Sequence, residues 1–274
     1  MATDRPIILI TGANTGLGFE AVKALANSST PYEIIVGCRT TSKGDDAVNQ
    51  LQKEIKTSSS LSTLQVDLES DTSIEKAIQE ITSKYGRLDV LVNNGGASFD
   101  PHIASGKLSI RDGFNKSWDV NVSGTHVLTH HAIPLLLKSS DPRLMFVTSG
   151  TSSMHETIAP DMPPPIQRIN ASPDAGWPKP AGLNPITTYR SSKAGLNMLT
   201  REWARILKND GVKVWAISPG FLATGMSGLS IDMLKKMGAM SPSVGGEFIR
   251  DVVQGKRDGD VGKIVKYDGG IQPW

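Results

Sequence analysis

The sequence ITGANTGLGFEA (residues 10–21) joins a short apolar run to an amphipathic stretch. The run IILIT (7–11) has the length and composition of a buried strand, and GLGFEAVKALANS (16–28) carries its apolar residues on one helical stripe. Three glycines lie between these elements at the spacing GxxxGxG: Gly12, Gly16 and Gly18. Such glycines turn the chain, let the backbone approach a pyrophosphate and pack the helix close to the sheet. Because the start of a helix presents N–H groups to an anion, we predict a dinucleotide-binding turn, with a ligand-free glycine turn as the alternative.

The alternation of apolar runs and amphipathic stretches continues along the chain. Further strands are predicted at 32–38, 61–67, 88–94, 143–149, 211–218 and 262–270. Further helices are predicted at 44–57, 71–85, 118–138 and 186–209. Apolar strands separated by helices are typical of a parallel sheet covered on both faces. We therefore expect one α/β domain over residues 1–274, a doubly wound (Rossmann) sheet of about seven strands.

The bulk composition is that of an ordinary globular protein. The 274 residues are 38% hydrophobic and 20% charged, and a net charge of +2 is too small to indicate nucleic acid or a membrane surface as partner. The first residues, MATDRPIILITG, fit neither a signal peptide nor a membrane span, so we expect a cytoplasmic protein. The single cysteine, Cys38, lies in an apolar run and is expected to be buried and inert. The adjacent His130 and His131 have no acid or cysteine at metal-ligand spacing, so no metal is expected.

The end of the second predicted strand bears on the choice of dinucleotide. A carboxylate about 20 positions beyond the glycines would bind the ribose hydroxyls of NAD. The segment 37–43 contains no carboxylate but does contain Arg39, which can clamp a 2′-phosphate and stack on adenine. We therefore predict NADP(H); a solvated surface arginine is the alternative.

Further motifs follow the glycine turn in order: VDL (66–68), NNGG (93–96), NVSGT (121–125), VTSG (147–150), YRSSK (189–193) and SPGFLAT (218–224). Together with TGANTGLG they resemble the short-chain dehydrogenases/reductases over nearly the whole chain, from Pro6 to the last predicted strand. The resemblance implies a catalytic tetrad of Asn121, Ser149, Tyr189 and Lys193. It implies cofactor contacts from Gly12, Asn14, Thr15, Gly16, Leu17, Gly18, Arg39, Asp67, Leu68, Asn94, Gly95, Lys193, Pro219, Gly220, Leu222 and Thr224.

Three details of the resemblance refine these expectations. An arginine after the second strand marks the NADP-preferring group of the family. That group often has a basic residue before the second glycine, where this chain has Thr15, so Arg39 would carry more of the selection. Gly95 stands where alanine is usual, and we expect this departure only to loosen the backbone.

Tyr189 and Lys193 are four residues apart on a predicted helix and therefore share one face. Reducing a carbonyl by hydride leaves negative charge on its oxygen, which needs a proton and hydrogen bonds as the charge forms. A phenol is a weak acid, and a neighbouring ammonium is expected to lower its pKa. Ser149 follows the fifth strand, where open α/β sheets bind ligands, and its hydroxyl can donate to the substrate oxygen. By resemblance, Asn121 holds a water that relays protons from the lysine.

Two segments are expected to shape the substrate site. Residues 150–188 contain half of the sixteen prolines and are expected to be an inserted loop without regular helix, anchored by four apolar residues: Met154, Ile158, Ile166 and Trp177. The insert resembles that of monomeric carbonyl reductases, so we favour a monomer, with a homo-oligomer as the alternative. Residues 221–240 contain four of the nine methionines and lie where the family keeps its substrate lid; simple helix packing is the alternative.

These patterns favour an NADPH-dependent carbonyl reductase, reversible as an alcohol dehydrogenase. Its substrate is expected to be a bulky apolar or aromatic ketone or aldehyde, bounded by Phe99, Trp177 and Phe221. One alternative is a non-catalytic NADP(H)-binding regulator on the same fold. Another is an accessory reductase that acts on one intermediate of a biosynthetic pathway.

Overall fold

Eight strands form one sheet in the order β3-β2-β1-β4-β5-β6-β7-β8. The computed structural model describes residues 4–158, 164–179 and 186–274. Its strands are β1 (Ile7–Thr11), β2 (Glu33–Cys38), β3 (Ser60–Gln65), β4 (Val90–Asn93), β5 (Arg143–Val147), β6 (Lys213–Ser218), β7 (Ile264–Lys266) and β8 (Ile271–Gln272). All neighbouring pairs are parallel except β7 and β8, which are antiparallel. The predicted doubly wound sheet of about seven strands is confirmed, with the short β8 added at its edge.

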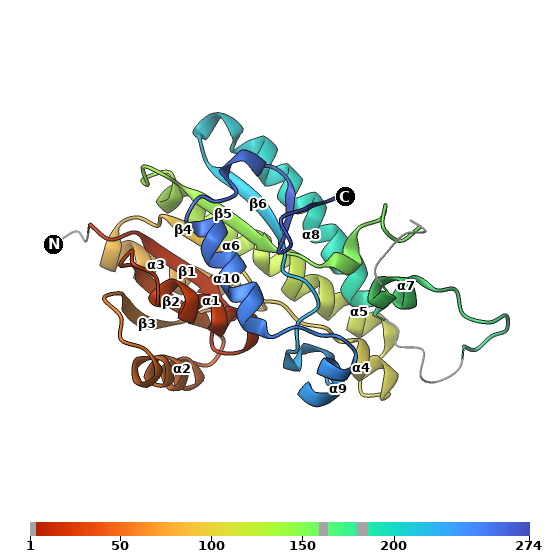
Figure 1. Ribbon diagram of the computed structural model, residues 1–274. Helices are drawn as coiled ribbons and strands as arrows, with labels where there is room; N and C mark the ends of the chain where they lie inside the picture. Colours follow the sequence, from red (N-terminus) through yellow and green to blue (C-terminus); the bar gives the residue numbers. More distant parts are fainter. Residues whose placement is uncertain (1–3, 159–163, 180–185) are drawn as a thin grey trace.

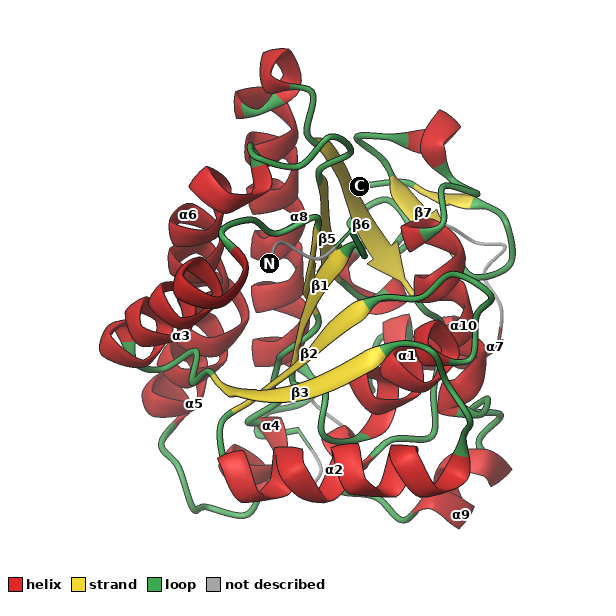
Figure 2. Ribbon diagram, turned by 90° about the vertical axis from the view of Figure 1, so that its left-hand side faces the viewer, coloured by secondary structure: helices red, strands yellow, loops and turns green. Residues whose placement is uncertain are grey.

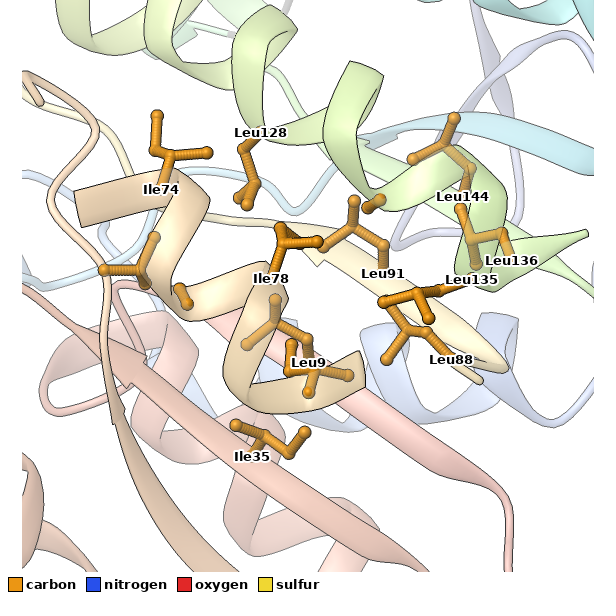
Figure 3. Packing of buried hydrophobic residues seen from close by; sticks show 14 of the residues in the cluster. Leu9, Ile35, Ile74, Ile78, Leu88, Leu91, Leu128, Leu135, Leu136 and Leu144 are labelled. Carbon is orange, nitrogen blue, oxygen red and sulfur yellow. The ribbon is translucent and has the colours of Figure 1, made fainter. Parts of the chain in front are cut away.

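Helices cover both faces of this sheet (Figures 1 and 2). One face carries α1 (Gly16–Ala26), α2 (Thr41–Glu54) and α10 (Pro242–Val253), whose apolar side chains pack with β1, β2 and β6. The other face carries α3 (Asp71–Tyr85), α6 (Thr125–Leu136) and α8 (Thr187–Ile206), whose apolar side chains form the second cluster. Figure 3 shows part of that second cluster, in which Ile78 of α3 lies beside Leu91 of β4 and Ile74 of α3 lies beside Leu128 of α6. No helix in the described part of the chain is long and apolar enough to cross a lipid bilayer.

The predicted helix over 118–138 is divided in the structure. The segment consists of a π-helical turn, η1 (Asp119–Gly124), between α5 (Ile110–Trp118) and α6. Short π-helical segments inside α-helices often mark functional sites. Asn121 lies within this turn, fully buried.

Helix α10 was not predicted, yet it fixes the position of α1. Gly245 and Gly246 let α10 approach very closely, because a Cβ atom on Gly246 would lie 2.5 Å from the carbonyl carbon of Glu20. A Cβ atom on Gly245 would lie 2.7 Å from side-chain carbons of Leu17 and Leu222. The consecutive glycines were the sequence signal for this close contact.

The proline-rich insert contains a helix, α7 (Pro164–Asn170), contrary to the expectation of a loop without one. Proline is compatible with the first turn of a helix because its missing N–H would have no partner there. The expected apolar anchors are also largely wrong, since Met154, Ile158 and Trp177 are 70%, 85% and 88% exposed. Part of the insert, residues 159–163 and 180–185, lies outside the described residues. The expectation of a monomer loses the support that buried anchors would have given it.

The segment 221–240 leaves the sheet and returns to the same point. Leu222 and Met240 form an isolated parallel bridge, with Met240 N donating to Phe221 O at 2.8 Å and Ala223 N donating to Met240 O at 2.9 Å. Between these ends lie η4 (Gly225–Ser227) and α9 (Ile231–Lys236). We call residues 221–240 the closed loop.

Candidate active site

The predicted site residues gather at the carboxyl ends of β1, β2, β4, β5 and β6. Because these strands are parallel neighbours, the loops that follow them share one edge of the sheet (Figure 1). Thr11, Asn94, Ser149 and Pro219 each follow or end one of these strands. This edge of the sheet therefore carries most of the predicted cofactor-binding and catalytic residues.

The glycine turn has the geometry that its spacing predicts. Gly12 and Gly16 have positive φ angles of 61° and 56°, a conformation that L side chains rarely adopt. A Cβ atom on Gly18 would lie 2.5 Å from Gly12 O and 2.6 Å from Asn94 Nδ2, so no side chain fits there. Asn14 and Thr15 complete the turn, partly buried and exposed respectively. The turn can therefore present its backbone closely to an anionic group.

The end of β4 holds the glycine turn in place. Asn94 Nδ2 donates to Thr11 O at 2.8 Å and to Gly12 O at 3.3 Å, and Gly95 N donates to Thr11 Oγ1 at 2.8 Å. A Cβ atom on Gly95 would lie 3.0 Å from Leu68 Cδ1 and 3.1 Å from Thr11 Oγ1. An alanine here would therefore be tight against the side chains of Leu68 and Thr11, and the expectation that Gly95 only loosens the backbone stays a prediction.

The motif after β6 lies against the same turn. The Thr224 methyl group is 3.6 Å from the position that a Cβ atom on Gly16 would take. Gly220 has a φ angle of 90°, and a Cβ atom there would lie 2.5 Å from Met240 Cε. Pro219 joins Leu17 and Leu222 around Gly245 of α10. The start of α1 is not capped by its own side chains. Thr15, the residue before this helix, makes no side-chain hydrogen bond to it, and the first turn has no acidic residue. The first N–H groups of α1 therefore have no side-chain partner from the helix itself.

Arg39 extends from the end of β2, with its side chain 71% exposed. Its Nη1 lies 3.6 Å from Glu69 Oε2, and Glu69 also pairs with Lys116 at 3.1 Å. Asp67 Oδ1 accepts a hydrogen bond from Glu69 N at 3.1 Å. The sequence prediction missed Glu69, which lies two residues beyond Asp67 and places a carboxylate beside Arg39.

Ser149, Tyr189 and Lys193 come together between β5 and α8. The Ser149 hydroxyl lies close enough to the Tyr189 phenol to oppose part of the rise in its pKa, and it pairs with Thr151 Oγ1 at 2.9 Å. Lys193 is 3% exposed, its Nζ donates to Val147 O at 2.8 Å, and the same Nζ lies 5.8 Å from the centre of the Tyr189 ring. One helical turn thus places the phenol and the ammonium on one face, as the spacing predicts.

The acidity of this pair differs from the prediction. Burial raises the pKa of Tyr189, and the hydrogen bond from Ser149 opposes this rise only in part. Burial lowers the pKa of Lys193 from 10.5 to about 8. The prediction that Lys193 holds the phenol pKa below its ordinary value is wrong for this arrangement. The ammonium lies beside the ring and hydrogen-bonds a main-chain carbonyl, and desolvation dominates both groups.

Both ends of the Asn121 side-chain amide are hydrogen-bonded, to the backbone of Ala97 and to the Ser192 hydroxyl. Its Nδ2 donates to Ala97 O at 2.8 Å and to Ser192 Oγ at 2.9 Å, and its Oδ1 accepts from Ala97 N at 2.8 Å. Ser192 Oγ donates in turn to Tyr189 O at 2.9 Å. The structure therefore brings all four predicted catalytic residues into one connected site.

Two further residues that touch this site were not predicted. Asp100, at the start of α4 (Asp100–Ala104), accepts hydrogen bonds from the first turn of α8. Gln272 of β8 donates to Ser149 O at 3.1 Å from a position 1% exposed. No signal in the sequence pointed to Asp100, because it lies 88 positions away from Thr188 along the chain.

Comparison with known proteins agrees with this geometry. The family model of short chain dehydrogenases matches residues 6–160 and 175–234. The chain is 42% identical over 273 residues to the short-chain dehydrogenase/reductase tropE of Talaromyces stipitatus, covering 99% of each chain. It is 47% identical over 278 residues to the short-chain dehydrogenase/reductase eupG of a Phoma species, covering 98% of this chain and 97% of that one. An NADPH-bound carbonyl reductase from chicken fatty liver has the same fold, with a TM-score of 0.77, 20% identity and coverage of 99% and 100%.

The chain belongs to the short-chain dehydrogenase/reductase family. It is an oxidoreductase that acts on carbonyl or alcohol substrates.

Proposed function

We propose that the protein reduces a ketone or aldehyde with NADPH, with Tyr189 as the general acid. The observation that carries this proposal is the position of the buried Lys193 ammonium, 5.8 Å from the centre of the Tyr189 ring, with Ser149 close to the phenol. The two hydroxyls converge at the sheet edge that also holds the glycine turn. A carbonyl oxygen placed between them would receive two hydrogen bonds.

The residues present suit a nicotinamide dinucleotide. Gly18 leaves room that any Cβ atom would fill, and the first turn of α1 carries N–H groups without side-chain caps. Thr224, which packs against Gly16, and Pro219, which lies beside Gly245 of α10, would border the phosphate and nicotinamide groups. When bound, the dinucleotide would supply a hydride from C4 of its nicotinamide ring.

The chain's own residues would then do the following. Ser149 Oγ donates a hydrogen bond to the substrate carbonyl oxygen and polarises the C=O bond. Tyr189 Oη donates its proton to that oxygen as negative charge develops there. The positive charge of Lys193 Nζ would offset part of the burial cost of the resulting phenolate without bringing the phenol pKa below its ordinary value, and Nζ can also hydrogen-bond a ribose hydroxyl. Asn121 fixes the backbone around Tyr189 through Ser192.

NADP(H) rather than NAD(H) is the proposed cofactor, on the strength of Arg39. Its exposed guanidinium can turn toward a 2′-phosphate, and its 3.6 Å contact with Glu69 is long enough to be exchanged for a stronger phosphate pair. Arg39→Asp is expected to shift the ratio of kcat/KM for NADPH over NADH toward NADH by at least about tenfold. Lys43→Asp, in the first turn of α2, is the matched control. An unchanged ratio in the Arg39 variant would assign the selection to another residue.

The proposed substrate is bulky and apolar or aromatic. Phe99 and Phe221 are partly buried at the site edge, and the closed loop exposes Met226 by 41% and Met233 by 50%. Flexible thioethers on an exposed loop adapt to varied apolar ligands. Trp177 is removed from the predicted walls, because its 88% exposure leaves it in solvent.

The test is Tyr189→Phe, with Tyr85→Phe on α3 as the matched control. NADPH consumption is followed against a panel of ketones, aldehydes and quinones, and NADPH binding is followed by its fluorescence. The proposal expects turnover to fall at least about a hundredfold in Tyr189→Phe with unchanged NADPH affinity, because only the proton donor is lost. A non-catalytic NADP(H)-binding regulator would show no turnover in the wild-type chain and no effect of this change. Full activity in Tyr189→Phe would refute the assignment of the general acid.

A further inference from the structure

Asp100 is a buried carboxylate that holds the backbone of the proposed general acid. The side chain is 4% exposed. Its Oδ1 accepts from Thr188 N at 2.9 Å, and its Oδ2 accepts from Tyr189 N at 3.0 Å and from Thr188 Oγ1 at 2.8 Å. The Ser98 hydroxyl adds a contact of 3.2 Å to Oδ2. The carboxylate thus receives four hydrogen bonds, two of them from consecutive N–H groups at the start of α8.

Helix α8 depends on this contact because it has no cap of its own. The residue at its N-cap position is Ile186, which makes no side-chain hydrogen bond to the helix, and its first turn has no acidic residue. The first N–H groups of a helix need acceptors, and a negative charge near them is favourable. Asp100 supplies both from a helix that is 88 positions away in sequence from Thr188.

The backbone N–H and the backbone C=O of Tyr189 are therefore held by different parts of the chain. The N–H is bound by Asp100, while the C=O accepts from Ser192 Oγ, which is itself held by Asn121. Asn121 also binds both backbone groups of Ala97. The segment 97–100 is thus linked to both backbone groups of Tyr189, directly through Asp100 and indirectly through Ala97, Asn121 and Ser192.

We propose that Asp100 is a positioning residue that orients Tyr189 for proton transfer. This inference rests on the proposed function of Tyr189. Proton donation depends on the direction of the phenol, and a small displacement of the helix start moves the hydroxyl away from Ser149 and the substrate oxygen. Asp100 acts through the backbone of Tyr189 and does not itself touch the reacting atoms.

The main variant is Asp100→Asn, which keeps the side-chain shape but replaces one acceptor oxygen by a donor. The second is Thr188→Val, which removes the hydroxyl bound to Oδ2 and keeps the packing. The matched control is Ser117→Ala, because Ser117 is 1% exposed and its hydroxyl donates to Thr188 Oγ1 at 2.9 Å rather than to Asp100 or Tyr189. Turnover of 4-nitrobenzaldehyde is normalised to the number of NADPH sites measured by fluorescence titration, so that misfolded protein is not counted.

The proposal expects kcat per NADPH site to fall at least about tenfold in Asp100→Asn and at least about threefold in Thr188→Val. KM for the aldehyde and Kd for NADPH are expected to stay within about threefold, and Ser117→Ala is expected to behave as the wild-type chain. Proportional losses of kcat and of NADPH sites, leaving kcat per site unchanged, would show a purely structural role and overturn the proposal. If Asp100→Asn does not fold, Thr188→Val decides between these outcomes.

A second readout does not depend on turnover. Tyrosine labelled with ¹³C at Cζ gives a Tyr189 resonance that is assigned by its loss in Tyr189→Phe. In the presence of NADP⁺ this resonance is expected to shift in Asp100→Asn and to remain in place in Ser117→Ala. An unmoved resonance in Asp100→Asn would overturn the positioning role. If the wild-type chain reduces no carbonyl compound, the proposed function fails, while the resonance still decides whether Asp100 orients Tyr189.

Discussion

Replacing Lys193 by methionine is expected to make the protein more stable while removing its activity. Lys193 is 3% exposed, and burial lowers its pKa from 10.5 to about 8. That fall corresponds to about 3 kcal/mol of free energy by which folding disfavours the charged amine, at 1.36 kcal/mol for each pH unit. The hydrogen bond from Lys193 to Val147 O returns about 1 kcal/mol. Lys193→Met is therefore expected to raise the free energy of unfolding by about 2 kcal/mol at pH 7.

The stability difference between Lys193→Met and the wild-type chain is expected to shrink as the pH rises. The folded protein releases the Lys193 proton above about pH 8, whereas the unfolded chain keeps it up to pH 10.5. Between these values the unfolded state binds more protons, so the stability of the wild-type chain rises relative to that of Lys193→Met. The advantage of the variant is fully present below about pH 8 and is mostly lost near pH 10.

Urea unfolding of both proteins at about pH 7 and about pH 10 measures this difference. Lys76→Met, on an exposed position of α3, is the control for adding a methionine. A Lys193→Met protein that is less stable than the wild-type chain at pH 7 would refute the reasoning. A stability difference that is equal at both pH values would refute it as well.

Two further predictions concern parts of the fold outside the proton-transfer site. Gly246→Ala is expected to lower the free energy of unfolding by about 1–3 kcal/mol and to weaken NADPH binding, because a Cβ atom would meet Glu20 of α1 at 2.5 Å. Gly259→Ala is the control, because nothing lies within 4 Å of a Cβ atom there. Equal stability of the two variants would contradict the close packing of α10 on α1. Asp258→Asn is expected to lower the free energy of unfolding by about 1–3 kcal/mol at pH 7, because buried Arg143 loses a charged partner at 2.7 Å. Pairing with Arg143 lowers the pKa of Asp258 below 3.8, so the stability difference between Asp258→Asn and the wild-type chain is expected to disappear as the pH falls through the acidic range. Denaturant unfolding at two pH values tests this. A stability difference that persists in acid would contradict it.

The sequence was sufficient for the central sheet because local signals and tertiary packing agree there. The runs IILIT, EIIVGC and RLMFV are buried strands as predicted, and the glycine spacing at 12, 16 and 18 has the backbone conformation it indicates. The four predicted catalytic residues meet because they follow neighbouring parallel elements. Such placement follows from strand order alone.

Other features could not be predicted because they depend on contacts between distant segments. The pKa of Tyr189 follows burial, which the spacing of Tyr189 and Lys193 does not report. Asp100 caps a helix that begins far along the chain, and Glu69 reaches Arg39 from the loop after another strand. In the insert, the proline run led to a wrong expectation because a proline at a helix start is compatible with the helix.

The bridge between Leu222 and Met240 has a consequence for how this scaffold can be re-engineered. Since the two ends of the closed loop are hydrogen-bonded to each other beyond the end of β6, the residues between them form a cassette with fixed attachment points. Exchanging residues 225–239 for a sequence of different length or polarity keeps Thr224 against the glycine turn and is expected to leave the strands and the proposed catalytic residues where they are. A library confined to this cassette is therefore expected to vary substrate selectivity while keeping the proposed catalytic residues.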